Sequence, residues 1–310
     1  MNREIRVAVT YSVRAKIAYE IALGLSGLDF FRGDKIIVTN GVQLEGLNDL
    51  GGPLLLEKEE QDLVFLNPSS ISYMASNGKG PYDHPVDLRV IAVFPSWDRL
   101  CFAAKKDLNM ATPMEISQRK LPLKLSTRAQ NQYGSTAFAL NKVLNYYQCS
   151  IEYIEKMGGQ VDRVVNPRDN TRIDGIKHGM YDLVFDEDIT GWGETALENG
   201  MVFLELDEGC FRMMEELGFC KKTIPRSKFS RLEKDVEALE FGGWPLCCRA
   251  DKSEDVVYHI TEAIDRRKES IVADGSKVNM RNICRDTEEG PLCISLHPGA
   301  ERYYKEFGYL

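Results

Sequence analysis

The chain has 310 residues, of which 43% are hydrophobic and 28% charged, a composition typical of a globular protein that buries a core. Its net charge of -8 argues against nucleic acid as a partner, because binding a phosphate backbone requires a basic surface. No apolar run approaches the roughly 18 residues needed to cross a bilayer, so membrane insertion is not expected. At roughly 150 residues per domain, the length predicts two lobes.

The N-terminus and the cysteines bear on location. Residues 1–6 lead directly into a predicted strand, without the apolar stretch and cleavage site of an export signal. The eight cysteines form no C-x-x-C pair, which is typical of reduced, buried thiols. We therefore expect a cytoplasmic protein as the chain stands, or a periplasmic one if a signal has been removed. No metal-ligand spacing and no phosphate-binding glycine motif is present, so neither a metal nor another cofactor is expected.

The first predicted unit is a strand at residues 5–10, followed by a helix with an apolar residue at every fourth position, namely Val13, Ile17, Ile21 and Leu25. An irregular stretch follows and ends at residues 51–53. Asn67 and Pro68 are typical of the start of a helix, and they come directly after a short apolar run. Strands are predicted at residues 62–66, 86–93 and 99–104.

The pattern begins again near Pro113, and this predicts a second lobe. A strand at 123–127 and a helix at 134–147 are followed by further elements of both kinds. These are a helix at 171–178 and strands at 181–185 and 201–206. After residue 235 a glycine-rich strand segment and a helix at 254–271 indicate a return to the first lobe. We predict lobe one as residues 1–104 plus 240–310 and lobe two as residues 105–239, in an α/β fold of mostly parallel sheets with helices on both faces.

Two segments resemble a known family. Residues 296–306 read Leu-His-Pro-Gly-Ala-Glu-Arg-Tyr-Tyr-Lys-Glu and are followed by Phe-Gly-Tyr, and residues 257–263 read Val-Tyr-His-Ile-Thr-Glu-Ala. Both are similar to segments of the solute receptors of TAXI-type TRAP transporters. The resemblance implies a two-lobed, type II periplasmic-binding-protein-like fold with a cleft between the lobes. It also implies a protein that binds a small molecule and serves membrane transporter subunits.

Candidate ligand-binding residues follow the predicted strands, because ligands of open parallel sheets bind at the carboxyl ends of the strands. Four turns qualify, and the resemblance implies the same four. Their candidate residues are Tyr11, Ser12, Asn67, Ser69, Ser70, Ser126, Thr127, Arg128, Asp186, Glu187 and Asp188.

Arg128 is the strongest candidate. A guanidinium can hold a carboxylate through two hydrogen bonds, and Arg128 stands shortly before a predicted helix start that includes Tyr133. The alternatives are a surface arginine or a strut to an acidic loop. The serine and threonine hydroxyls either bind ligand or cap their own helices.

The acidic cluster and the tryptophans carry alternatives of their own. The carboxylates of residues 186–188 suit a ligand ammonium, a hard cation or acid-base work, unless Asp188 caps the next helix and Glu187 is solvated. Trp97, Trp192 and Trp244 fall in predicted loops or strand ends, where they either wall a pocket or fill a lobe interface.

These observations favour a binding protein that closes around a small organic acid, with no catalytic residues predicted. One alternative is a cytoplasmic enzyme, for example a decarboxylase, on the same fold. Another is a cytoplasmic sensor that presents a ligand-dependent shape to a protein partner.

Overall fold

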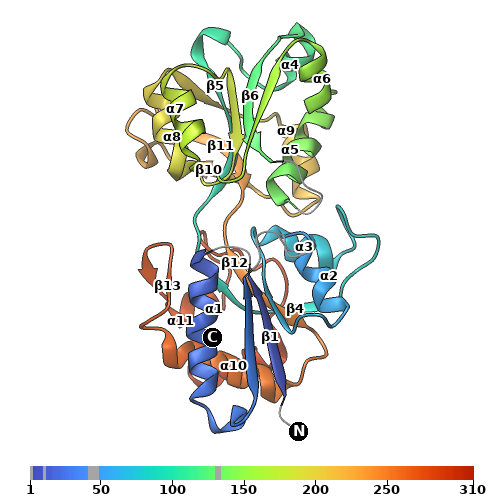
Figure 1. The fold of residues 1–310 in the computed structure, drawn as a ribbon, viewed down its shortest axis with the longest axis vertical. Coiled ribbons are helices and arrows are strands. Elements are labelled where there is room, and N and C mark those ends of the chain that lie inside the picture. Colours follow the sequence, from blue (N-terminus) through green and yellow to red (C-terminus); the bar gives the residue numbers. More distant parts are fainter. Residues whose placement is uncertain (1–2, 10–11, 41–48, 130–133) are drawn as a thin grey trace. The chain divides into compact units, whose positions relative to one another are not determined.

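The computed structural model describes residues 3–9, 12–40, 49–129 and 134–310. The chain forms two compact units. Unit 1 consists of residues 1–97 and 242–310, and unit 2 of residues 98–241. Each unit holds a sheet with helices on both of its faces (Figure 1).

The five-stranded sheet of unit 1 has the order β2-β1-β3-β12-β4. Strand β1 runs parallel to β2 and β3, whereas β12 runs antiparallel to β3 and β4. The carboxyl ends of β1, β2, β3 and β4 therefore share one edge of the sheet with the beginning of β12. The bounds are β1 (Glu4–Val9), β2 (Lys35–Asn40), β3 (Leu63–Phe65), β4 (Leu88–Phe94) and β12 (Trp244–Arg249).

Helices α1 and α10 cover one face of this sheet, and α2 and α3 cover the other (Figure 1). In α1 the predicted apolar face is buried at Ile17, Ile21 and Leu25, whereas Val13 is 40% exposed. The bounds in unit 1 are α1 (Ser12–Ser26), α2 (Gly52–Glu57), α3 (Ser70–Ser76), α10 (Glu254–Arg267), α11 (Met280–Ile283) and α12 (Pro298–Glu306). A short hairpin joins β13 (Val272–Ala273) to β14 (Ser276–Lys277).

The C-terminal segment that carried the resemblance anchors α12 to the core of unit 1. Nδ1 of His297 accepts a hydrogen bond from the Gly299 N–H at 3.1 Å and so caps the helix. A Cβ atom on Gly299 would lie 2.2 Å from the Glu254 carbonyl oxygen, so this contact requires glycine. The Tyr304 hydroxyl donates to the Ile91 carbonyl of β4 at 3.0 Å. The sequence signature is thus explained by packing.

The seven-stranded sheet of unit 2 has the order β10-β11-β5-β8-β6-β7, with β9 also paired to β5. Strand β6 runs parallel to β7 and β8, and the remaining pairs are antiparallel. The strands are β5 (Arg99–Lys105), β6 (Lys124–Arg128), β7 (Gln160–Val164), β8 (Leu183–Asp186), β9 (Met201–Leu204), β10 (Lys221–Ile224) and β11 (Val236–Glu240).

Helices α7 and α8 lie on one side of the unit 2 sheet, and α5 and α6 lie on the other (Figure 1). Apolar side chains of α5, among them Leu140 and Leu144, are buried. The helices are α4 (Met114–Arg119), α5 (Ser135–Tyr146), α6 (Ile151–Lys156), α7 (Asn170–Lys177), α8 (Ile189–Glu198) and α9 (Glu208–Glu215).

The α/β class is confirmed, but the sheets are mixed rather than mostly parallel. Strands β5 and β12 each enter a sheet against the direction of their neighbours. The predicted lobe ranges also differ from the two units near residues 99–104, because β5 pairs with β8, β9 and β11 of unit 2. The stretch expected to be irregular before residue 51 contains β2.

Candidate functional site

The parallel pairing of β6 and β8 brings Arg128 and Asp186 together at the strand ends of unit 2. Nε and Nη2 of Arg128 lie 3.3 and 3.2 Å from Oδ1 of Asp186. Nη2 also donates to Oε1 of Glu187 at 2.6 Å, and Nη1 donates to the Val165 carbonyl at 3.1 Å. Arg128 is only 8% exposed. These contacts correspond to the strut alternative; that Arg128 also binds a ligand carboxylate stays a prediction.

A second arginine, Arg172 of α7, completes this network. It is fully buried and its Nη1 pairs with Oδ2 of Asp186, which is itself fully buried. Nε of Arg172 donates to Oγ of Ser126 at 3.0 Å. The neighbouring Thr127 hydroxyl donates to the Phe185 carbonyl at 3.0 Å. Both predicted hydroxyls are therefore buried and engaged inside unit 2, and Arg172 gave no sequence signal beyond its place on a predicted helix.

The turn at residues 187–188 leads into α8. The Asp188 carboxylate binds Nη2 of Arg168 at 2.8 Å and accepts from the Thr190 hydroxyl at 3.1 Å. It forms no hydrogen bond that caps the helix, and Glu187 is paired with Arg128 rather than solvated. The predicted alternative that Asp188 caps α8 is therefore wrong.

Asp98, which sequence reasoning missed, takes the capping position instead. Its Oδ2 accepts from the Asp188 N–H at 2.7 Å, and its Oδ1 accepts from the Ile189 N–H at 3.4 Å. Burial raises the pKa of Asp98 well above its usual value, and the charges of Glu187 and Asp188 raise it further. The only sequence signal was an aspartate directly before a predicted strand.

Trp192 does not wall a pocket in the described part of unit 2. It lies in α8 rather than in the predicted loop, and it is 0% exposed. Its Nε1 donates to the Glu187 carbonyl at 2.8 Å, and its ring packs edge-on to Phe203 at 6.2 Å. Trp192 thus supports the 187–188 turn from inside the core.

In unit 1 the predicted polar residues after β3 are gathered at the strand-end edge. Asn67, Ser69 and Ser70 are all buried. The Oγ atoms of Ser69 and Ser70 have no hydrogen-bond partner among the described residues. The cost of burying such a hydroxyl without a partner is about 1–3 kcal/mol, and most native structures avoid it.

The start of β12 leaves room for Ser69. Gly243 has φ +78°, and a Cβ atom there would lie 2.2 Å from Oγ of Ser69. The backbone is fixed at this point, since the Ser69 N–H donates to the Gly242 carbonyl at 3.1 Å and the Gly243 N–H donates to the Ser96 carbonyl at 3.0 Å. Glycine is therefore required beside the serine hydroxyl.

Arg14, in the first turn of α1, brings a positive charge to the same edge. It is 3% exposed, and Nη2 lies 3.5 Å from Oδ1 of Asp49. Its guanidinium also lies 5.7 Å from the ring centroid of Trp244, the half-buried first residue of β12. Sequence reasoning did not select Arg14, because one arginine in a helical pattern resembles a surface residue.

The remaining predicted residues are placed as follows. Trp97 is half-buried, and its backbone N–H donates to Oδ2 of Asp274 at 3.1 Å. Tyr11 and Tyr133 lie outside the described residues. Ser12 is the first residue of α1, and its side chain also lies outside the description.

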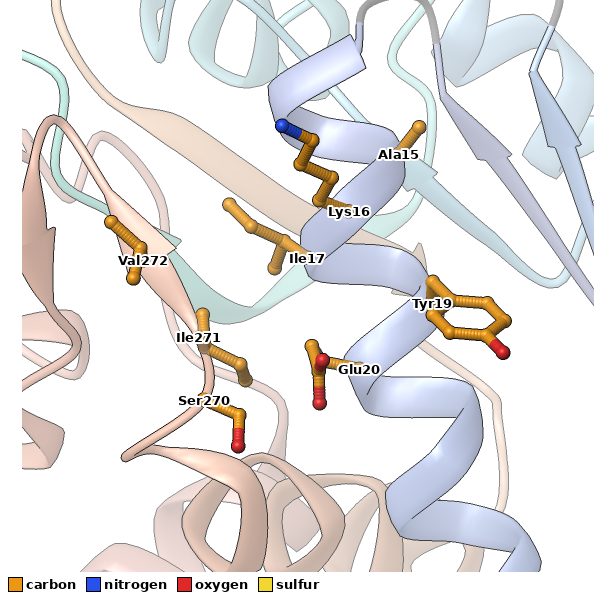
Figure 2. A pocket seen from close by; sticks show the side chains of 8 residues that line it. All are labelled: Ala15, Lys16, Ile17, Tyr19, Glu20, Ser270, Ile271 and Val272. Carbon is orange, nitrogen blue, oxygen red and sulfur yellow. The ribbon is translucent and has the colours of Figure 1, made fainter.

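A pocket of about 540 Å³ lies away from these residues, beside α1 (Figure 2). Ile17 and Glu20 of α1 face the segment of Ser270, Ile271 and Val272 across it (Figure 2). Its lining residues are Ala15, Lys16, Ile17, Tyr19, Glu20, Ser270, Ile271 and Val272. None of them is a predicted site residue, and the Glu20 carboxylate is paired with Arg267.

Within residues 3–9, 12–40, 49–129 and 134–310, no group of three or more histidine, cysteine or acidic side chains is arranged to hold a metal ion. No helix in these ranges is both long enough and apolar enough to cross a bilayer. All eight cysteines are free thiols.

Three solved structures similar to the chain are solute-binding proteins. ProX of Borrelia burgdorferi, a glycine betaine and L-proline-binding protein, is 10% identical over 87% of this chain and 95% of its own, with a TM-score of 0.47. Lactococcal OpuAC, in complex with glycine betaine, is 8% identical over 99% and 97%, with a TM-score of 0.43. The periplasmic aliphatic sulphonate-binding protein SsuA of Escherichia coli is 14% identical over 87% and 76%, with a TM-score of 0.38.

The sequence itself matches a family. Residues 54–308 fit the pattern of the NMT1-like family, a range that begins in α2 and ends just after α12. The match includes parts of unit 1 and the whole of unit 2. The chain therefore belongs to the NMT1-like family.

Proposed function

We propose that this chain binds a small organic molecule, and that the ligand reaches the strand-end edge of the unit 1 sheet, where Ser69 and Ser70 form hydrogen bonds with it. The observation that carries the proposal is the pair of buried hydroxyls without a described partner. Hydroxyl groups donate and accept, so a ligand oxygen or nitrogen satisfies both.

The local backbone supports this use of the edge. Gly243 keeps the space beside Ser69 free of a side chain, and the bond from the Ser69 N–H to the Gly242 carbonyl fixes the serine backbone. Fixed polar groups in a largely apolar surrounding are the usual design of a small-molecule site. In this proposal the chain provides the ligand with hydrogen-bonding groups that are already in place.

We further propose that the ligand carries an acidic group. Arg14 places a buried guanidinium at the same edge, and arginine binds carboxylates and related oxyanions through paired hydrogen bonds. The Trp244 ring beside Arg14 offers a flat apolar surface to the organic part of the ligand. That Arg128 of unit 2 binds a ligand carboxylate stays a separate prediction.

We also propose the partners and the location of the protein. A solute-receptor role implies membrane transporter subunits as partners and a periplasmic location after removal of a signal. The TAXI-type assignment belongs to this proposal and is supported by the resemblance of residues 257–263 and 296–306, of which the second segment anchors α12. Because we propose a ligand with an acidic group, aliphatic sulfonates, glycine betaine and short carboxylic acids are the first compounds to screen.

The test combines binding with stability. Native mass spectrometry identifies a copurified compound, and calorimetry with that compound or the screened set measures affinity. We expect Ser69→Ala and Ser70→Ala each to weaken binding about tenfold, the worth of one hydrogen bond. Without ligand, both variants should be as stable as the wild type or more stable, because an unsatisfied buried hydroxyl is removed.

Ser76→Ala is the matched control. Its hydroxyl, at the other end of α3, donates to the Tyr73 carbonyl at 3.2 Å, so its removal should leave affinity unchanged. Wild-type affinity in both Ser69→Ala and Ser70→Ala, together with a lower melting temperature, would show that these hydroxyls serve the fold alone.

A further inference from the structure

Asp98 joins two parts of unit 2 that are far apart in the sequence. It is the first residue of unit 2 and stands directly before β5. Its carboxyl group reaches the start of α8, where it accepts the N–H groups of Asp188 and Ile189. Asp98 and α8 are separated by about ninety residues, so the chain folds back to make this contact.

We infer that the Asp98 carboxyl group is the built-in occupant of the N-terminal end of α8, and that it is a positioning residue for the Glu187–Asp188 turn. The N-terminus of a helix is where unpaired N–H groups would attract an external anion. In this unit the protein's own side chain fills that place. The inference does not depend on the ligand site proposed for unit 1.

The helix's own N-cap residue is diverted from capping. Asp188 has a left-handed backbone, with φ 51°, and its carboxylate binds Arg168 and Thr190 instead of the helix backbone. The α8 N–H groups therefore depend on a side chain from another element. Asp98 fulfils this role with both oxygens, because Oδ2 accepts from the Asp188 N–H and Oδ1 from the Ile189 N–H. Oδ1 also accepts from the Arg99 N–H at 2.7 Å.

The same residue ties the turn to the segments where the chain enters and leaves unit 2. The Asp98 carbonyl accepts from the Phe241 N–H at 3.2 Å and from Nη1 of Arg99 at 2.8 Å. Nη1 of Arg99 also pairs with Oε1 of Glu240 at 2.9 Å, and both side chains are buried. Asp98 thus contacts the 187–188 turn through its side chain and the segment at which the chain leaves unit 2 through its backbone carbonyl.

The experiment removes the carboxyl group and supplies another. We expect Asp98→Ala to expose the amides of residues 188 and 189, so that their hydrogen exchange accelerates about tenfold or more. Formate at about 100 mM should enter the hole, slow that exchange again and raise the melting temperature of the variant by about 2–4 °C. The wild type should show no such gain, because its own carboxyl group occupies the place.

Asp169→Ala is the matched control. Asp169 caps α7 in the same unit by accepting from the Thr171 N–H at 2.9 Å, but this side chain is not enclosed. Its loss should lower stability without creating a place that formate fills. Equal formate effects in Asp98→Ala and Asp169→Ala would overturn the inference, as would unchanged exchange of amides 188 and 189 in Asp98→Ala.

Asp98→Asn covers the case in which Asp98→Ala does not fold. Asparagine keeps the size of the side chain but turns one acceptor into a donor, which then faces a backbone N–H. We expect faster exchange at residue 188 or 189 in this variant, with other α8 amides unchanged. Wild-type exchange at both amides in Asp98→Asn would also overturn the inference.

Discussion

In unit 1 the hydroxyls of Ser69 and Ser70, after β3, are buried without a hydrogen-bond partner among the described residues, whereas in unit 2 the charged groups at the ends of β6 and β8 are bonded to one another. Ser69 and Ser70 belong to the first kind. Asp186, with Arg128 and Arg172 on either side, belongs to the second. The charges of the unit 2 cluster are paired with one another, although Nη2 of Arg172 has no hydrogen-bond partner among the described residues. A buried hydroxyl without a partner has an energetic reason to bind a ligand, whereas a buried ion pair has an energetic reason to stay as it is.

This contrast changes how the acidic cluster at residues 186–188 is interpreted. Three carboxylates at residues 186–188 looked like a ligand site in the sequence, yet Arg128, Arg168 and Arg172 bind all three within unit 2. An external ligand would have to compete with these internal pairs. In unit 1 the uncharged serines are the stronger candidates, although they gave the weaker sequence signal.

The largest effect is expected from Asp186→Ala. This change leaves the buried Arg172 without its carboxylate, and breaking a buried ion pair in this way costs about 3–5 kcal/mol. Urea unfolding should show a much lower midpoint, while Ser69→Ala in unit 1 should not lower it. A loss below about 1 kcal/mol for Asp186→Ala would remove the distinction between the two edges.

A smaller effect is expected from Arg128→Ala, and this variant separates strut from ligand contact. Asp186 keeps Arg172, so the fold loses only the pairs of Arg128 with Asp186 and Glu187, worth about 1–2 kcal/mol. Unfolding and ligand titration should be measured on the same samples. A stable variant with a hundredfold weaker affinity would instead assign Arg128 to ligand binding.

Most helices and strands whose apolar residues recur in a regular local pattern were predicted from the sequence. The helix that begins unit 1 follows from the spacing of Ile17, Ile21 and Leu25, all of which are buried. Strand β2 was missed because it sits in a stretch that also contains turn residues. The predicted lobe range failed at β5 because strand pairing is a tertiary property, which no local pattern encodes.

The candidate site was harder to predict than the fold. Position at strand ends singled out Ser69 and Ser70 as candidate ligand contacts, which stays a prediction, and both residues are buried. Arg172 and Asp98 were missed because their roles depend on partners 14 and 90 residues away in sequence. A lone arginine in a helix and a lone aspartate before a strand look like surface residues until those partners are known.

The smallest effect per measured step, below about 1.4 kcal/mol for each pH unit, is expected from pH, and it concerns the Asp98 carboxyl group at the start of α8. Glu187 and Asp188 face Asp98, and burial acts with their charges to raise its pKa, while the N–H bonds from Asp188 and Arg99 lower it. The folded state therefore binds the Asp98 proton more tightly than the unfolded chain does. The resulting stabilisation is largest below the unfolded pKa, about 3.8, and is lost as pH rises through the raised pKa of the folded state. Asp98→Asn cannot titrate at this position. Relative to this variant, the free energy of unfolding of the wild type should therefore fall as pH rises, by less than about 1.4 kcal/mol per pH unit. Urea unfolding of both proteins between about pH 4.5 and 7.5 measures the difference, a range that begins just above the ordinary aspartate pKa. Parallel curves would mean that Asp98 stays ionised in both states, stabilised by its N–H donors, and that unit 2 holds its helix terminus with a permanent carboxylate.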